Sequence, residues 1–263
     1  MKSNQKESDA FLLHATKFKE TSLLCSFFSK EFGKVSAIAK GARSKKSKFQ
    51  VLTVPGAVFK IAFSGRKDLK TLTSCESLET LDIKGPNFKI YLYLNEIILK
   101  LLEPYEPMPE VYESLIKIFK FLDGNKNESI EFELRRFEYS LISELGYGFN
   151  MDRDVEGNEI EVDSRYSFNP QLGFSKGERG QKILGQHLIN FIQRNFDEPE
   201  TRFSIKMIMR TAIENIIEKP LSSREVFKSF CCFKVTIFGA YSSVLWLYWE
   251  LNSLAIFDAS ISL

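Results

Sequence analysis

The chain has 263 residues, of which 44% are hydrophobic and 27% charged, and its formal net charge is +2. This size and composition allow one large folded domain or two modest ones with a buried core, and they exclude a disordered tail. The small net charge hides an asymmetry, because residues 1–82 carry 15 basic against 8 acidic side chains, a net charge of +7, whereas the remainder carries −5. We expect the N-terminal end to meet a polyanion and the other end to meet proteins.

The cysteines and the N-terminus indicate the cellular setting. Cys25, Cys75, Cys231 and Cys232 include no C-x-x-C pair, so they predict neither a zinc site nor a disulfide framework and fit a reducing cytosol. The first ten residues, MKSNQKESDA, have no apolar core of the kind that a signal peptide needs. We therefore expect a short mobile leader.

Five short strands are predicted in the first 76 residues. Apolar-rich runs at 10–16 and 22–29, joined by the polar turn KFKE, precede an alternating strand that starts at Phe32. Two more runs, at 57–63 and 69–76, are joined by the turn SGRKD. Five such strands, with glycine in the last turn, are typical of a small Greek-key barrel of the oligonucleotide-binding (OB) kind, although a purely structural barrel stays open.

The third predicted strand leads into a basic loop. The alternation of apolar residues ends at Gly41, and small or hydroxyl residues then separate Arg43, Lys45, Lys46 and Lys48. Such a loop suits a phosphate backbone, because long cations reach several phosphates and serines donate hydrogen bonds to phosphate oxygens. Short basic clusters are common, so a solvated strand connection is the alternative.

Beyond KGPN, at residues 84–87, the apolar period changes from two to about three and a half, so helices are expected. Prolines in EPYEPMPE stop the first helix, and Gly146-Tyr147-Gly148 is expected to cap the third. The predicted helices cover residues 90–102, 110–122, 130–145, 181–195, 201–218 and 221–230. His14 and His187 are isolated, and we interpret them as ordinary core or surface residues.

The third predicted helix holds a candidate peptide site. Arg135 and Arg136 lie beside Phe137, so two guanidinium groups border an aromatic ring that an acidic, apolar peptide could contact. Ordinary helix-surface pairing with Glu131, Glu133 and Glu138 is the alternative.

Two regions depart from this helical pattern. Residues 149–174 are polar, acidic and irregular, contain no Cys or His, and allow a small hairpin or two. From Cys231 onward the chain is strongly hydrophobic, and between Lys234 and Asp258 only Glu250 is charged. A weak membrane anchor, a buried interface element and a tail replaced by a reading-frame change all remain open for this stretch.

Several runs resemble, in order, the RecO family of bacterial recombination mediators. They are AFLLHATKFKETSLL at 10–24, KVSAIAKGARSKKSKF at 34–49, SGRKDLKTLTSCE at 64–76, YLNEIILKLL at 93–102, LRRFEYSLISELGYG at 134–148 and KPLSSREVFKSF at 219–230. The resemblance implies an α+β chain: an N-terminal five-stranded OB-fold barrel at 1–83, a helical domain at 84–230 with a small irregular subdomain at 149–176, and an atypical tail at 231–263. Many relatives have a cysteine zinc cluster in that subdomain, which here contains no cysteine and should lack zinc.

The resemblance also implies a cytoplasmic, nucleoid-associated protein without catalytic turnover or cofactors. It would bind single- and double-stranded DNA, anneal complementary strands and, with RecR, help load RecA onto DNA coated by single-strand-binding protein (SSB). Arg135, Arg136 and Phe137 would then hold the SSB C-terminal tail. The expected DNA contacts are Lys34, Lys40, Arg43, Lys45, Lys46, Lys48, Arg66, Lys67 and Lys70.

Two other classes of function remain open. The basic loop serves equally well in an RNA-binding OB-fold protein, and the C-terminal stretch allows a membrane-anchored adaptor. An enzyme is disfavoured, because the sequence has no Gly-rich phosphate loop and no metal-ligand cluster, and its two histidines lack activating partners.

Overall fold

A computed structural model describes residues 5–53, 56–123, 130–177, 183–217 and 221–223. Contacts divide the chain into two compact units, Met1–Lys126 with Leu221–Leu263, and Asn127–Pro220. The division predicted from the sequence, at residues 83 and 84, stays a prediction. The first unit contains two helices as well as the barrel, because both helices pack against its strands.

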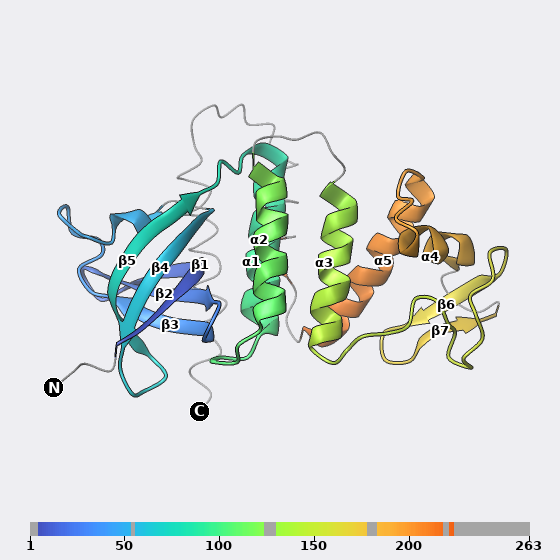
Figure 1. The fold of residues 1–263 in the computed structure, drawn as a ribbon, viewed down its shortest axis with the longest axis horizontal. Coiled ribbons are helices and arrows are strands. Elements are labelled where there is room, and N and C mark those ends of the chain that lie inside the picture. The colour runs from blue at the N-terminus through green and yellow to red at the C-terminus, as the bar shows by residue number, and fades with distance from the viewer. Residues whose placement is uncertain (1–4, 54–55, 124–129, 178–182, 218–220, 224–263) are drawn as a thin grey trace. The chain divides into compact units, whose positions relative to one another are not determined.

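The first unit begins with a closed five-stranded barrel (Figure 1). Its strands are β1 (Lys6–Phe18), β2 (Ser22–Ser29), β3 (Gly33–Ala39), β4 (Ala57–Ser64) and β5 (Lys70–Thr80), with the short helix η1 (Gln50–Thr53) between β3 and β4. The order around the barrel is β1-β2-β3-β5-β4, and β1 pairs with β4 to complete the ring. All the pairings are antiparallel except that of β3 with β5. The predicted OB-fold barrel is confirmed.

Two strands are longer than the sequence indicated. Residues Lys6–Asp9 pair with β4, from Lys6 opposite Phe63 to Asp9 opposite Lys60, so the prediction of a mobile leader as far as Ala10 is wrong for these residues. Strand β5 continues past Glu76 to Thr80, which lies opposite Ala57. The first extension is entirely polar, and the second contains only one apolar residue, the exposed Leu78, so neither gave an alternating apolar signal.

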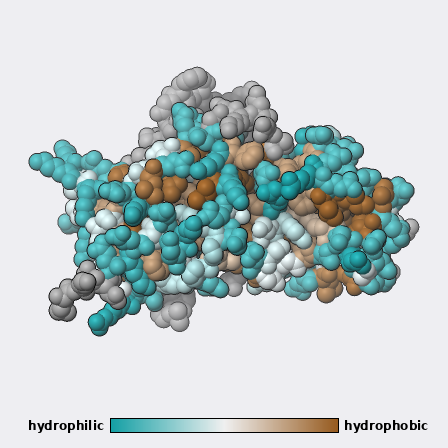
Figure 2. Space-filling model, viewed as in Figure 1, coloured by the Kyte–Doolittle hydropathy of each residue, from teal (hydrophilic) through white to brown (hydrophobic). Residues whose placement is uncertain are grey.

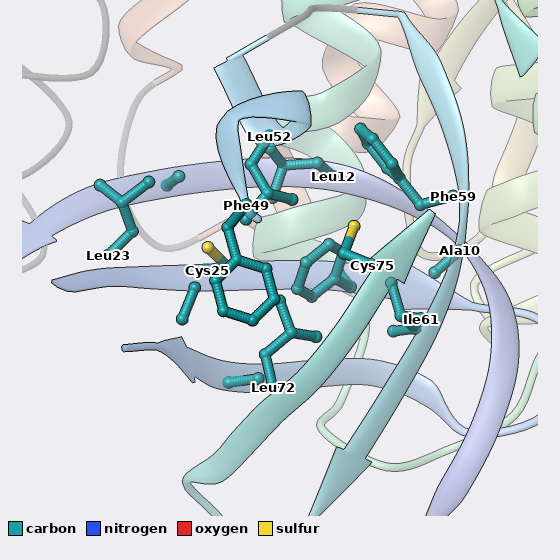
Figure 3. Close-up of a cluster of buried hydrophobic side chains, with 14 of the residues drawn as sticks. Ala10, Leu12, Leu23, Cys25, Phe49, Leu52, Phe59, Ile61, Leu72 and Cys75 are labelled. Atoms are coloured by element: carbon teal, nitrogen blue, oxygen red, sulfur yellow. The ribbon is translucent and has the colours of Figure 1, made fainter. Parts of the chain in front are cut away.

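Alternating side chains fill the barrel with an apolar core. Figure 3 shows Leu12, Cys25, Ile61 and Leu72 pointing inward from four different strands, and each is less than 10% exposed. Leu52 of η1 and Phe49, the residue just before η1, pack into the same core. Burial raises the pKa of the Cys25 and Cys75 thiols to about 12, so both behave as apolar side chains.

Helices α1 (Gly85–Leu101) and α2 (Pro109–Leu122) pack on the outer side of the barrel through aromatic rings. Phe11 of β1 lies 5.0 Å from Phe119 and 5.4 Å from Tyr112, measured between ring centroids, and Phe28 lies 5.6 Å from Tyr112. The Gly56 amide donates a hydrogen bond of 3.1 Å to the hydroxyl of Tyr91. Because these contacts bury both helices against the strands, the barrel and the helices form one compact unit.

The chain returns to this first unit at residues 221–223. Glu96 of α1 is only 2% exposed, and its carboxylate accepts hydrogen bonds from the amides of Ser222 and Ser223 at 2.7 and 2.8 Å. Lys100, one turn later, lies 3.0 Å from the same carboxylate. The buried charge is therefore compensated by two amides and an amine. The rest of the predicted helix at 221–230 and the tail at 231–263 lie outside the described residues.

The second unit combines helices α3 (Ile130–Glu144), α4 (Gly185–Ile192) and α5 (Pro199–Ile216) with a small sheet of β6 (Arg165–Asn169), β7 (Gly173–Lys176) and β8 (Ile183–Leu184). Helix α3 ends as predicted: Gly146 has a φ of +82°, and the Tyr147 amide bonds the Ile142 carbonyl at 2.9 Å. The subdomain folds around Phe149, whose ring lies 4.7 Å from that of Phe168 and 5.8 Å from that of Phe174. Figure 2 shows hydrophobic residues at the surface around β6 and α4.

Gly33 provides a test of the contact between the barrel and the chain after α1. Its φ of +65° is left-handed, and a Cβ at this position would collide with the backbone of Glu106. We expect Gly33→Ala to lower the free energy of unfolding by about 2–4 kcal/mol, from backbone strain and overpacking together. Urea denaturation measures the change.

Gly41→Ala is the matched control, because Gly41 has a similar φ of +69° with nothing within 4 Å of the added Cβ. It should show only the backbone strain, about 1–2 kcal/mol. Equal losses of stability in the two variants would contradict the close contact with Glu106.

His14 provides a pH test. The side chain is 5% exposed, and burial lowers its pKa from 6.5 to about 4. Between these values the unfolded chain binds a proton that the folded chain does not, so stability falls as the pH falls through this window. The loss between pH 7 and pH 5 should be about 2 kcal/mol, and His14→Gln should remove it. Urea denaturation at pH 7 and pH 5 measures the free energy of unfolding of both proteins. If the variant and the parent lost the same free energy of unfolding, groups other than His14 would cause the acid sensitivity.

Candidate nucleic-acid interface

The basic loop between β3 and η1 is exposed, whereas a buried apolar residue lies at each of its ends. Ala42 and Phe49 are 7% and 3% exposed, whereas the charged residues between them are exposed. The backbone folds in short turns, with the Ser44 amide on the Gly41 carbonyl at 3.1 Å and the Ser47 amide on the Ser44 carbonyl at 3.1 Å. Apolar anchoring of both ends therefore holds the cations at the surface.

Arg43 fastens this loop to the turn between β1 and β2. Its backbone amide donates to the Thr21 carbonyl at 2.9 Å, and its guanidinium donates to the carbonyls of Lys19 at 2.6 Å, of Ser22 at 3.3 Å and of Glu20. A guanidinium with donors on several carbonyls orders the two turns relative to each other. The structure thus gives Arg43 a positioning role beside its predicted contact with DNA.

Three of the predicted lysines also donate to main-chain carbonyls. The amine of Lys48 bonds the Thr73 carbonyl of β5 at 2.7 Å and lies 5.1 Å from the Phe49 ring centroid. The amine of Lys70 bonds the Lys67 carbonyl at 2.6 Å and lies 4.6 Å from the ring centroid of Tyr105. These bonds leave the charge of each amine uncompensated by a carboxylate.

Lys34 is the third of these lysines and lies in a different environment. Its amine donates at 2.8 Å to the carbonyl of Leu99, in the last turn of α1, where carbonyls lack partners within the helix. Burial lowers its pKa, and the Glu103 carboxylate partly offsets this effect. We therefore propose that Lys34 links the barrel to α1 rather than contacting DNA.

The remaining predicted contacts are fully at the surface. In the part of the chain that the structure describes, no ion pair includes any of the nine predicted DNA contacts. Figure 2 shows hydrophilic side chains over much of the visible surface at the barrel end of the chain. Among the nine predicted contacts, five are exposed and have no hydrogen bond from the side chain to a described residue: Lys40, Lys45, Lys46, Arg66 and Lys67.

The two basic groups flank the same strand. Ala39, at the end of β3, pairs with Leu23, next to the turn that Arg43 holds, and the basic loop follows directly. On the other side of β3, Ala37 pairs with Lys70 at the start of β5, which the turn containing Arg66 precedes. The arrangement therefore places cations on both sides of the C-terminal half of β3.

The β1–β2 hairpin adds two basic residues that are not among the nine predicted DNA contacts. Lys17 and Lys19 are exposed on either side of Phe18, and the Lys19 amine lies 5.6 Å from the centroid of that ring. The available signal was the motif KFKE, whose composition alone predicts only a polar turn. Its proximity to the basic loop depends on the long-range bonds of Arg43.

The predicted peptide site on α3 is largely internal. Arg135 is 9% exposed and donates at 2.6 Å to Glu138, which is completely buried, and Phe137 is 5% exposed. Arg136 lies at the surface, 3.4 Å from Glu133. The docking role of this group stays a prediction, and a peptide on the surface would meet Arg136 rather than Arg135 or Phe137.

Neither a metal-binding group nor a membrane-spanning helix is found among the described residues. Among them no group of three His, Cys, Asp or Glu side chains is placed to hold a metal ion. None of the described helices is long and apolar enough to cross a membrane. The hydrophobic stretch at 234–258 lies outside these residues.

The barrel order and the cationic loops on both sides of β3 define a protein of the OB-fold class. The family model described as "Recombination protein O N terminal" matches residues 1–81, and "Recombination protein O C terminal" matches residues 87–225. The chain belongs to the RecO family of DNA repair proteins.

Curated relatives agree with this assignment. The chain is 33% identical over 225 residues to the DNA repair protein RecO of Actinobacillus pleuropneumoniae serotype 5b, covering 83% of this chain and 93% of the relative. It is 33% identical over 226 residues to that of Salmonella dublin, with 84% and 93% covered. For Dechloromonas aromatica the identity is 30% over 235 residues, with 87% and 97% covered.

The different environments of the predicted lysines can be tested by salt dependence. Lys45→Ala/Lys46→Ala should weaken DNA binding and make the slope of log K against log salt shallower by about 2, one for each phosphate that is no longer neutralised. Lys34→Met should leave that slope unchanged and lower the free energy of unfolding by about 1–3 kcal/mol, because the Leu99 carbonyl loses its donor. Fluorescence anisotropy at several salt concentrations and urea denaturation measure the two effects, and a shallower slope for Lys34→Met would restore it as a DNA contact.

Proposed function

We propose that this chain is a non-catalytic recombination mediator. It binds single- and double-stranded DNA, anneals complementary strands and acts with RecR to load RecA onto SSB-coated DNA. Membership of the RecO family supports this function. The observation that carries it is the group of exposed cations beside β3, none of which forms an ion pair with a carboxylate of the described residues.

Annealing by such a surface is electrostatic. Two complementary strands repel through their phosphates, and a protein that binds both removes much of this repulsion when counterions are released. Lysine side chains contact the backbone as flexible point charges, so they leave the base edges free to pair. Lys40, Lys45 and Lys46 meet this requirement, because their amines are exposed and hydrogen bond to no described residue.

The proposed protein partners follow from charge and from family membership. The net charge of −5 after residue 82 favours contact with proteins over contact with DNA in that part of the chain. For the acidic SSB tail we propose the surface of α3 around Arg136, the exposed residue of the predicted site. RecR and RecA are proposed partners from family membership alone, and so is a cytoplasmic location at the nucleoid.

Strand annealing tests the proposal directly. The full chain should accelerate pairing of complementary oligonucleotides covered by SSB, measured by fluorescence energy transfer between labelled strands. Lys40→Ala/Lys45→Ala/Lys46→Ala should lower the second-order annealing rate by about 10- to 100-fold at low salt, because three phosphates are no longer neutralised.

Lys206→Ala is the control, since Lys206 is an exposed lysine of the second unit. It should anneal at the wild-type rate. If the triple variant annealed strands at the wild-type rate, these lysines would not be the annealing surface. In a separate competition assay, tighter binding of RNA than of DNA would favour an RNA-binding protein instead.

A further inference from the structure

The outer face of the barrel at the end of β1, β2 and β3 carries three apolar side chains that the barrel core does not use. Phe18, Leu24 and Ile38 are only partly buried, and none of them belongs to the core cluster. Their sequence neighbours Cys25, Ala37 and Ala39 do belong to it. Because side chains alternate between the two faces of a strand, the three residues point away from the barrel interior.

Strand register places these residues close together on one face of the barrel. Leu24 pairs with Ile38 on one side and with Thr16 on the other, and Phe18 pairs with Ser22, two residues before Leu24. Leu24 and Ile38 are thus directly opposite each other, and Phe18 is the diagonal neighbour of Leu24 on the same face. These three residues are defined here as the apolar strip. Lys40, two residues after Ile38 on the same alternation, lies at the end of the strip and is exposed.

The surroundings of the strip are polar or basic. The other outward positions at this end of the three strands are Thr16, Ser22, Ser26 and Ser36, none of which is acidic. The acidic side chain of the hairpin, Glu20, lies in the turn itself. The bonds from Arg43 to the carbonyls of Lys19 and Ser22 hold Phe18 next to the basic loop with Lys45 and Lys46.

We propose that the apolar strip is the contact for unpaired bases, with Phe18 as the stacking residue that lets this protein distinguish single-stranded from duplex DNA. An aromatic ring between cations suits a base attached to a phosphate, because the base stacks on the ring while the phosphates meet Lys19, Lys40 and the basic loop. A duplex keeps its bases stacked on one another, so it meets only the cations. This inference rests on the proposed DNA binding and adds the residues that read the bases.

The test measures the affinity of the full chain for three probes of equal length: oligothymidine, an abasic single strand and a DNA duplex. Phe18→Ala should weaken binding of oligothymidine by about 5- to 50-fold, the usual effect of removing one base–aromatic stack. Binding of the abasic strand and the duplex should stay within about twofold, and the salt slope should not change, because the variant keeps every cation that neutralises a phosphate.

Phe18→Tyr keeps a stacking ring and should bind oligothymidine nearly as tightly as the wild type. Phe203→Ala is the matched control, because Phe203 is a 61% exposed phenylalanine of the second unit. It should leave all three affinities unchanged. Thermal unfolding of each variant shows whether the barrel remains folded.

The outcomes separate this inference from the proposed function. Suppose that Phe18→Ala binds oligothymidine like the wild type while Lys45→Ala/Lys46→Ala binds it weakly. The apolar strip is then not the contact for bases, but the proposed DNA binding stands. Equal weakening for the three probes with Phe18→Ala would also overturn the strip, since it would indicate a general change of the surface. A wild-type chain that binds none of the probes would overturn the proposed function and the strip together.

Discussion

The short parallel pairing of β3 with β5 is the contact on which the arrangement of the first unit depends. Only Ala37–Lys70 and Ile38–Thr71 are paired, yet this contact closes the barrel and leaves it without a free sheet edge. It also brings the β4–β5 turn next to β3, although the basic loop, η1 and all of β4 lie between them in the sequence. Without it the two basic groups would belong to different parts of the surface.

Several of the predicted DNA-contacting cations also hold the loops of the site in place. Placing several lysines and arginines close together costs free energy through mutual repulsion, most strongly at low salt. Here Arg43, Lys48 and Lys70 donate to main-chain carbonyls, which stabilise each cation without cancelling its charge. The loops are thereby held in place while the net charge of the surface stays positive, so a polyanion meets an ordered surface rather than flexible chains.

Most of the barrel could be predicted from the sequence, because strands such as β3 alternate strictly and so identify their own buried face. The environment of individual charged residues could not, since it depends on distant or helical neighbours. Lys34 alternates outward like Lys40 just beyond β3, but α1 supplies the carbonyl to which its amine donates. On α3, consecutive residues point about 100° apart, so Arg135, Arg136 and Phe137 cannot share one exposed face, and Arg135 pairs with the buried Glu138 instead. A helical binding surface requires a spacing of three or four.

The second unit shows how a small subdomain without cysteine ligands can be stabilised. Phe149, Phe168 and Phe174 form a cluster of rings with centroids 4.7–5.8 Å apart, and Tyr139 of α3 joins it at 5.6 Å from Phe149. Ring pairs at such distances contribute packing energy beyond the area they bury. Because this cluster connects the β6–β7 hairpin to α3, aromatic packing orders the subdomain and attaches it to the helices in one step.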